Sequence, residues 1–578
     1  MSETQAKAGA RLRRWGLRLG VAMLVLWLAH LLFLRLTRIA PPADAWSRAQ
    51  ALPKALPIPR GVRTFVGDNW VSRERGIWEY HLQGDALSMG YAHARLGTPL
   101  LVRTDEYMFG EFHHYVPSAA ARFLIRMGVL LRYRGLLDAV SDDMRVEMTG
   151  MAVGQPDLHA EFLPIFHRIV FYHALHDITQ TLEHSPLLGC TAFAAMGEAT
   201  AQTDPQTAGH LILGRNFDFE GPPIFDADKA VLFFRPSDPG KLPFASVAWA
   251  GMVGVVTGLN AAGIYASVNA LRTDDKGTAG VPVELLLREV LESAHTLDEA
   301  IAIVNRRPVF VPDLYVLGDG DRREAAVIER SPTRSFLRRS HDILAVANHA
   351  LSPEYQADRE NARLRNELTS GARQARTEEL LAQHRGRIDP PTALAMLRDK
   401  RGVGGKVLGL GNRNALDALI ATHSVVVDAT ARRLWVGQGP HALGRDLAFD
   451  LRRELAQSPA TAVTSADAAP PADLPEDPTL HSPEYRQFLD TEQALGSAEL
   501  LRRHRELDRA IDQAERAVAL SPLHCDARKR LADLYYERNQ PSDRLTARRH
   551  YQIFLTLSPP YLRDVREAEN RVATTPAS

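Results

Sequence analysis

The first strong pattern in the chain is an uncharged apolar run over residues 19–34, which follows a basic segment. A helix that spans a membrane needs about 20 apolar residues, and this run reaches that length if the flanking arginines extend to the membrane surface. It predicts an anchor over residues 19–38, with residues 1–18 in the cytoplasm and the remainder outside it, in a bacterial periplasm. A cleaved signal peptide is the alternative, because Ala43-Asp44-Ala45 is a small-x-small site.

The periodicity of apolar residues changes after the anchor. Residues 39–62 are rich in Pro and Ala, which predicts a spacer. Residues 63–189 have mainly the helical period. Residues 190–456 hold short apolar or alternating runs separated by Gly, Pro and Asp, which indicate strands, with a helix at 283–304 and a last strand pair at 423–439. An antiparallel sheet covered by helices, an α+β fold, is the expected architecture.

The last part of the chain is predicted to be a linker and a helical tail. Residues 457–483 are poor in aromatics and rich in Ala, Pro, Thr and Asp, which predicts a disordered linker. In the tail, residues 484–578, Leu520-Ser521-Pro522 recurs as Leu557-Ser558-Pro559, and this resembles a tetratricopeptide-type (TPR-like) helix pair. Two copies are fewer than the three usually needed for independent stability, so we expect the tail to cap the body or to bind a partner protein.

Composition and charge narrow the function classes. The 69 basic residues balance 69 acidic ones, and without a long basic block a nucleic-acid partner has no electrostatic support. Two cysteines, Cys190 and Cys525, exclude a disulfide scaffold and a cysteine-based zinc module. His167, His173 and His176 share one segment, but no acidic motif of metal-site spacing accompanies them, so we expect neither a metal nor another cofactor.

The candidate chemistry centres on Cys190, which opens the string CTAFAA over residues 190–195. The next predicted strand ends with GRNFDF over residues 214–219, which contains Arg215 and Asp218. A hairpin would bring both beside the cysteine. A thiolate nucleophile needs a nearby cation and a proton acceptor, and these strands supply both. The structural alternatives are a buried apolar cysteine and an ion pair at a strand end.

These two strings resemble the penicillin acyltransferase family of the N-terminal-nucleophile (Ntn) hydrolases, whose relatives include choloylglycine hydrolases and acid amidases. The resemblance covers most of residues 80–439, and it includes further matches at residues 84–93, 147–152, 258–264 and 347–349. It implies an αββα sandwich in which residues 63–189 are a helical pro-region and residues 190–456 the catalytic domain. The anchor and the tail lie outside it.

The resemblance implies that the chain cleaves itself between Gly189 and Cys190. Cys190 would become a new amino terminus, whose α-amino group, with a pKa of about 8, serves as the general base. Asp218 would hold this amine, and Arg215 would stabilise the thiolate. No separate histidine would then be needed as a base.

The resemblance also implies residues that bind the substrate. Asn269 and Asn348 would donate hydrogen bonds to the oxyanion, an interaction of about 3 kcal/mol, although Asn348 could instead be a turn residue. Asn216 is a further candidate for substrate binding. The family has another arginine on the helix after the second asparagine, and three residues compete for this place, of which we favour the second: Arg359, Arg363 and Arg365.

We therefore expect a membrane-anchored amidohydrolase or acyltransferase that acts through an acyl-thioester on Cys190. Its substrate would be a small acylated molecule, and the anchor favours N-acyl amines or lipid-like compounds. Two alternatives remain. One is a catalytically silent scaffold whose tail recruits a partner, and the other is a phospholipase-B-like esterase, because a thioester serves amides and esters alike.

Overall fold

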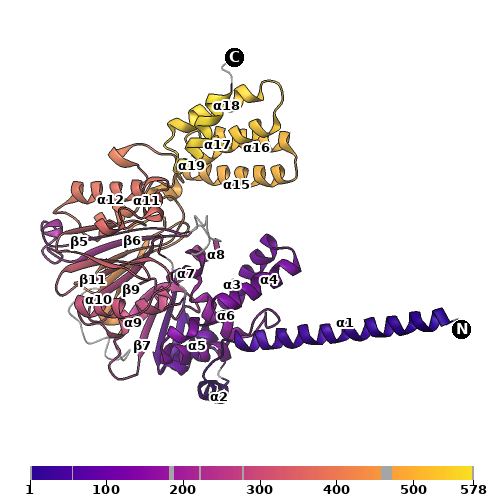
Figure 1. Ribbon diagram of the computed structural model, residues 1–578. Coiled ribbons are helices and arrows are strands. Elements are labelled where there is room, and N and C mark those ends of the chain that lie inside the picture. Colours follow the sequence, from indigo (N-terminus) through magenta and orange to yellow (C-terminus); the bar gives the residue numbers. More distant parts are fainter. Residues whose placement is uncertain are drawn as a thin grey trace.

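The structure is a computed structural model that describes residues 3–54, 56–180, 188–219, 223–275, 277, 279–456 and 471–575. It begins with one long helix, α1 (Glu3–Leu36), which projects away from the body (Figure 1). Within it, Arg14–Leu36 is long and apolar enough to cross a membrane and is not buried against the rest of the protein. The apolar run predicted at the amino terminus thus lies on a helix, which a signal sequence would also form.

The expected spacer and the start of the expected helical region contain regular structure of other kinds. Helix α2 (Ala43–Ala51) lies within the spacer, where Ala45 and Ala49 are buried against Leu87. Residues 58–84 form strands instead of helix: β1 (Ile58–Arg60), β2 (Arg63–Val66), β3 (Asn69–Ser72) and β4 (Trp78–Gly84). They extend a sheet formed by later residues, a long-range pairing that local periodicity does not reveal.

A helical layer follows, made of α3 (Ala86–Tyr115), α4 (Ala119–Arg132), η1 (Leu136–Ala139), α5 (Asp142–Gly154), α6 (Ile165–Tyr172) and α7 (Leu175–Gln180). Helices α3 and α5 touch backbone to backbone. A Cβ on Gly90 would lie 2.0 Å from the carbonyl oxygen of Glu147, and one on Gly150 would lie 2.3 Å from that of Leu87. The glycines of the two upstream motifs are therefore needed for close helix packing.

Two sheets make up the centre of the body. Among the described residues, the larger sheet has 11 strands in the order β1-β2-β3-β4-β7-β8-β9-β10-β11-β12-β13. The expectation of a purely antiparallel sheet was wrong, because β4 and β7 are parallel. The strands after β4 are β7 (Lys229–Pro236), β8 (Phe244–Trp249), β9 (Thr257–Asn260), β10 (Ile264–Ala270), β11 (Asp313–Asp319), β12 (Glu324–Arg330) and β13 (Ser335–Ser340).

The smaller sheet carries the strands of the predicted chemical centre. In the described part of the chain it has six strands in the order β14-β5-β6-β15-β16-β17. They are β5 (Leu188–Ala195), β6 (Ile212–Phe219), β14 (Ile343–Val346), β15 (Ala421–Asp428), β16 (Arg433–Gly437) and β17 (Asp446–Asp450). Apolar side chains of both sheets share one buried cluster, so the sheets pack face to face.

Helices cover both outer faces. On the larger sheet, the core joins α3 and α5 to α9 (Val283–Ser293) and α10 (Leu297–Arg306). The single helix predicted over residues 283–304 is thus two helices, because Thr296 caps the second by accepting a hydrogen bond from the Glu299 amide. The smaller sheet is covered by α12 (Ser370–His384) and α13 (Pro390–Leu397).

Short elements connect these layers: η2 (Gly197–Thr200), α8 (Pro223–Ala227), η3 (Pro353–Tyr355), α11 (Arg359–Asn366), η4 (Val403–Gly405) and α14 (Leu451–Glu454). Part of the predicted linker, residues 457–470, lies outside the described residues. The remainder is ordered on the body, because Leu474 pairs with Asp446 and the Ala472 carbonyl accepts from Trp435 Nε1 over 3.0 Å.

The tail is helical, as predicted. Its elements are η5 (Pro478–His481), α15 (Pro483–Arg503), α16 (Leu507–Leu520), α17 (Cys525–Arg538), α18 (Asp543–Thr556) and α19 (Leu562–Thr574). Figure 1 shows these helices (yellow) next to α11 and α12, on the side of the body that carries the smaller sheet.

Candidate functional site

The hairpin predicted around Cys190 is present and determines which way each side chain faces. Strands β5 and β6 are antiparallel, with Cys190 opposite Phe217 and Ala192 opposite Arg215. Residues directly opposite each other lie on the same face of a sheet. Cys190 and Arg215 therefore face the larger sheet, whereas Asp218, which is opposite Gly189, belongs to the other face.

The sulfur of Cys190 lies next to a buried guanidinium group. Arg215 Nη2 is 3.7 Å from Cys190 Sγ, and both residues are fully buried. The guanidinium is held in place by the Val256 carbonyl at 2.9 Å and by a short contact with Thr257 Oγ1. Burial raises the pKa of the Cys190 thiol, and the nearby Arg215 opposes this rise. The thiol therefore needs a proton acceptor before it can attack.

Asp218 places a carboxyl group next to the predicted cleavage point. A Cβ on Gly189 would lie 3.5 Å from Asp218 Oδ2. Burial raises the pKa of Asp218 to about 7, against the opposing charges of Arg373 and Arg413. Within the described residues, Asp218 Oδ1 is buried and accepts no hydrogen bond. A carboxyl group with this pKa can take up or release a proton near neutral pH.

Of the two predicted asparagines, Asn348 bonds to the Cys190 backbone and Asn269 lies next to Arg215. Asn348 Oδ1 accepts a hydrogen bond from the Cys190 amide over 2.9 Å, and its Nδ2 donates to the Ala270 carbonyl over 3.0 Å. Asn269 Nδ2 donates to the carbonyls of Val346 and Ala347. Both asparagines are thus brought to the site, but in the uncleaved chain their N–H groups are occupied by backbone carbonyls.

Sequence analysis missed a buried arginine, Arg373 on α12. Its Nη1 lies 2.5 Å from the Cys190 carbonyl and 2.9 Å from Thr191 Oγ1, and its Nη2 lies 2.7 Å from Asn348 Oδ1. The helix expected after Asn348 is two helices, α11 and α12, and Arg373 follows the break between them. The change of helix at Thr369 was the signal that could have found it.

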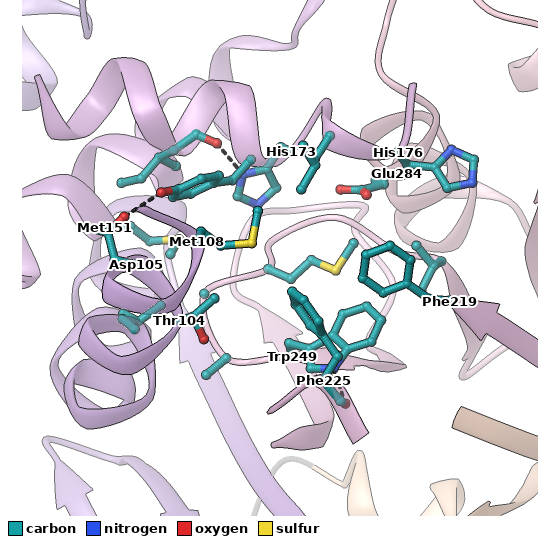
Figure 2. A pocket seen from close by; sticks show the side chains of 18 of the residues that line it. Thr104, Asp105, Met108, Met151, His173, His176, Phe219, Phe225, Trp249 and Glu284 are labelled. Carbon is teal, nitrogen blue, oxygen red and sulfur yellow. Dashed lines mark hydrogen bonds between the residues drawn. The ribbon is translucent and has the colours of Figure 1, made fainter. Parts of the chain in front are cut away.

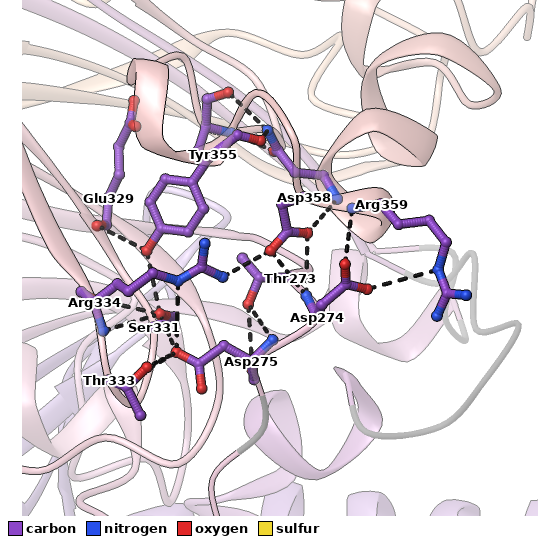
Figure 3. A network of polar contacts seen from close by, with 12 residues as sticks. Thr273, Asp274, Asp275, Glu329, Ser331, Thr333, Arg334, Tyr355, Asp358 and Arg359 are labelled. Carbon is purple, nitrogen blue, oxygen red and sulfur yellow. Dashed lines mark hydrogen bonds and ion pairs between the residues drawn. The ribbon is translucent and has the colours of Figure 1, made fainter.

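The three arginines favoured from the sequence lie elsewhere. Arg359 is 84% exposed at its side chain and is 3.7 Å from Asp274, in the polar network that joins the loop after β10 to α11 (Figure 3). Arg363 contacts Glu360 at 3.6 Å, and Arg365 donates to Gln356 Oε1. These contacts lie along α11 or on its solvent side, whereas Arg373 is the arginine after Asn348 that bonds to the Cys190 backbone.

Asn216 also requires a correction. Its neighbours in β6 alternate between the two faces of the sheet, so Asn216 faces the helices that cover the smaller sheet. Its Nδ2 donates to the carbonyls of Leu397 and Leu416 over 2.8 and 3.1 Å. Asn216 therefore fixes the end of α13 and a following loop, and it does not occupy the substrate-binding position that we predicted.

Two cavities lie close to neighbours of Cys190, although Cys190 itself lines neither of them in the described part of the chain. The first, of about 170 Å³, is lined mainly by apolar side chains of the helical layer and of the strand ends, among them Met108, Met151, Phe219 and Trp249 (Figure 2). It also touches Phe217, the residue opposite Cys190.

The second cavity, of about 80 Å³, is polar. It is lined by Gly189, Asp218, Asn348 and Arg373, together with Arg272, Arg413 and Tyr561. The apolar cavity thus reaches Phe217, which is opposite Cys190, and the polar cavity reaches Gly189, which precedes it.

Comparison with known proteins identifies the class. Residues 205–415 match the family model described as acyl-coenzyme A:6-aminopenicillanic acid acyl-transferase. The resemblance to this acyltransferase family that the sequence predicted is confirmed over these residues. The matched residues include Arg215, Asp218, Asn269, Asn348 and Arg373, and they begin after Cys190.

A curated relative and several solved structures are similar to parts of the chain. An uncharacterised protein of Archaeoglobus fulgidus is 27% identical over 333 residues, which are 51% of this chain and 53% of the relative, so the chain spans about half the length of this relative. Among structures, an N-acylethanolamine-hydrolyzing acid amidase ortholog of Caenorhabditis elegans is 19% identical, with 42% of this chain and 93% of that chain covered and a TM-score of 0.29.

Two further structures are bacterial. Penicillin V acylase from Agrobacterium tumefaciens is 15% identical, with 46% of this chain and 88% of that chain covered and a TM-score of 0.30. A mutant of conjugated bile acid hydrolase from Clostridium perfringens is 12% identical, with coverages of 46% and 95% and a TM-score of 0.30. The family assignment rests on the family model.

Proposed function

We propose that this chain is the precursor of a self-processing cysteine amidohydrolase or acyltransferase that acts through an acyl-thioester on Cys190. The observation that carries the proposal is the 3.7 Å contact between Cys190 Sγ and Arg215 Nη2, next to a glycine that adjoins Asp218. A nucleophile, a cation and a titratable carboxyl group thus converge on one peptide bond.

In the processing step, Cys190 Sγ attacks the carbonyl carbon of Gly189. Asp218 lies on the other face of the sheet, so the thiol proton would reach its ionised carboxylate through water, and the departing Cys190 nitrogen takes up a proton as the C–N bond breaks. Water then hydrolyses the resulting thioester, which leaves a carboxylate on Gly189 and a free thiol and α-amine on Cys190. Gly189 favours this step because it has no side chain to obstruct the sulfur.

Contacts to the Cys190 backbone also favour cleavage before this residue. Its amide is bonded to Asn348 Oδ1, and its carbonyl is bonded to Arg373. These two contacts can keep Cys190 in place after the residues before it have separated. The new α-amine would then stand beside the Asp218 carboxylate and serve as the base for turnover.

In turnover, the acyl group of the substrate is transferred to the sulfur and then to water or to a second amine. We assign the apolar cavity, of about 170 Å³, to the acyl chain. For the Nδ2 groups of Asn269 and Asn348 to bind the oxyanion, they must exchange their present partners, the carbonyls of β10 and of the segment from Val346 to Ala347, for it. Because this exchange needs a local rearrangement, the uncleaved chain is expected to be inactive toward substrates.

The layered fold is compatible with this chemistry. We propose that the two stacked sheets and their covering helices form the αββα sandwich of Ntn hydrolases, with a TPR-like tail attached. We further propose that residues 19–38 anchor the protein so that the catalytic domain lies outside the cytoplasm, near a bilayer surface. Acylated amines with lipid-like chains would be most concentrated there.

Denaturing electrophoresis tests the processing step. The wild type and Cys525→Ser should separate into two fragments divided at residue 190, whereas Cys190→Ala should remain one chain. Cys525 is a matched control, since it is the other buried cysteine and its Sγ donates to the Leu557 carbonyl over 3.2 Å. A wild type that stays intact but is fully active would refute self-processing.

Mass spectrometry tests the thioester. After exposure to acylated amines and esters, the added mass should be found on Cys190, and it would identify the acyl group. Adducts from esters alone would support the esterase alternative. A wild type that forms no adduct with either class, while the tail still binds a partner protein, would support the scaffold alternative.

A further inference from the structure

The polar cavity beside Gly189 has one wall that comes from the far end of the chain. Tyr561, the residue before α19, lines this cavity together with Asp218, Asn348 and Arg373. Tyr561 lies outside residues 205–415, which match the acyltransferase family. The space beside the nucleophile is thus enclosed partly by the family domain and partly by the tail.

Hydrogen bonds hold the segment around Tyr561 on the body. The Leu562 amide donates to the carbonyl of Glu367, at the end of α11, over 3.0 Å. On the other side of Tyr561, Asn414 Nδ2 donates to the Ser558 carbonyl over 3.1 Å. Because the segment is tied to the body at both ends, the position of Tyr561 is determined by the body as well as by the tail.

Close packing between the tail and a loop of the body also holds the tail in place. A Cβ on Gly409 would lie 2.4 Å from the Leu523 carbonyl oxygen, and a Cβ on Gly411 would lie 2.6 Å from Phe488 Cε2. Phe488 is also buried in an apolar cluster with Leu419 of the body. No larger residue could replace these glycines without moving the tail.

The loop that receives the tail is also part of the cavity. It continues from the two close-packed glycines to Arg413 and Ala418, which line the same space as Tyr561. Docking of the tail and the shape of the cavity therefore depend on one segment of the body.

We propose that the tail is part of the active site and that Tyr561 is a specificity-determining residue for the amine half of the substrate. This inference rests on the proposed acyl-thioester chemistry of Cys190. The larger cavity is apolar and suits an acyl chain, whereas the smaller one, of about 80 Å³, is lined by charged groups. It suits a compact polar amine, of the size of glycine, and the ring of Tyr561 closes it against larger ones.

The test compares two amides that share one acyl chain, N-dodecanoylglycine and N-dodecanoylphenylalanine. Full-length wild type, Tyr561→Ala and Tyr561→Phe are assayed in detergent micelles for kcat/KM. The wild type should prefer the glycine amide. Tyr561→Ala should shift the ratio at least about tenfold toward the phenylalanine amide, and Tyr561→Phe should keep the wild-type ratio because it keeps the ring. If the alanine variant fails to fold, Tyr561→Leu is measured against the same expectation.

A matched control uses another tyrosine of the tail. Tyr536 stacks against Arg544 and Arg571 on α18 and α19 and does not line either cavity in the described part of the chain. Tyr536→Ala should therefore keep the wild-type ratio. An unchanged ratio in Tyr561→Ala, or an equal shift in Tyr536→Ala, would overturn the inference, because the tail would then act only as a structural cap.

A third substrate separates this inference from the proposed function. 4-Nitrophenyl dodecanoate carries the same acyl chain and a leaving group that needs no amine site. If the wild type releases no nitrophenol, or if Cys190→Ala releases it equally well, the proposed function fails and this inference falls with it. If the ester is cleaved through Cys190 but neither amide is, the proposed chemistry of the thioester stands and the assignment of the smaller cavity to an amine is wrong.

Discussion

Arg373→Met is the perturbation for which the structure makes the sharpest prediction. The guanidinium of Arg373 donates to the Cys190 carbonyl at 2.5 Å and to Asn348 Oδ1 at 2.7 Å, and Asn348 in turn accepts from the Cys190 amide. Methionine has a similar length and no donor. The substitution therefore removes the support of the nucleophile's own backbone without touching the sulfur.

The magnitude follows from these contacts. A hydrogen bond from a charged donor contributes about 1.5–3 kcal/mol, and two such bonds orient Cys190. If most of this stabilisation applies to the transition state, loss of about 3–4 kcal/mol slows the reaction about 10²–10³-fold. Burial lowers the pKa of Arg373, and the nearby charge of Asp218 opposes this lowering. Burial of the charge has a cost that Arg373→Met removes, and this offsets part of the stability lost with the hydrogen bonds. We therefore expect thermal stability to change much less than rate.

The assay is a time course of self-processing by denaturing electrophoresis, followed by kcat and KM for the processed fraction. Arg365→Met is the control, because Arg365 is a half-buried arginine of the preceding helix that contacts Gln356. Arg373→Lys should be intermediate, since lysine supplies a charge but not the two-pronged geometry. Processing of Arg373→Met within threefold of the wild-type rate would show that our interpretation of these contacts is wrong.

Three further predictions concern other parts of the molecule. Burial raises the pKa of Asp218 to about 7, so the processing rate should rise as pH passes 7 while that of Asp218→Asn stays low and flat. Because the pKa of Asp218 is raised in the folded protein, the stability that its protonated form contributes is lost as pH rises through 7. Melting curves of Cys190→Ala, which should not process, can measure this loss. Glu147→Gln leaves Arg288 with Glu292 alone in the core and should cost about 3 kcal/mol of stability in thermal unfolding; an unchanged melting temperature would argue against the pairing. Met108→Trp should narrow the apolar cavity and raise KM for long acyl chains about tenfold over short ones, and equal effects on all chain lengths would contradict its assignment to the acyl chain.

Local patterns were sufficient for several elements of the fold. The last strand pair predicted at 423–439 corresponds to β15 and β16, and the helical tail and the apolar amino-terminal helix are also present. They were predictable because alternation, helical period and apolar run length are properties of consecutive residues. The strands over residues 58–84 were missed, and only the last of them, β4, pairs with a strand far along the chain, β7.

Some residues of the candidate site were likewise predictable from the sequence, and others were not. Cys190, Arg215 and Asp218 lie on one hairpin, so strand pairing alone brought them together, and the sequence predicted their proximity. Arg373 and Tyr561 reach the site by packing of separate helices. The change of helix at Thr369 marks where α12 begins, but no local pattern indicates that Arg373 or Tyr561 reaches the site.

The sequence by itself determined the resemblance to the acyltransferase family, the pairing of the two central strands and the residue types that these strands carry. The tertiary structure alone decided which arginine supports Cys190, which face Asn216 occupies and that the tail encloses the polar cavity. The physical reason is that a strand or helix specifies where its side chains point relative to its own axis, whereas the identity of the surface they meet depends on packing between elements that are hundreds of residues apart.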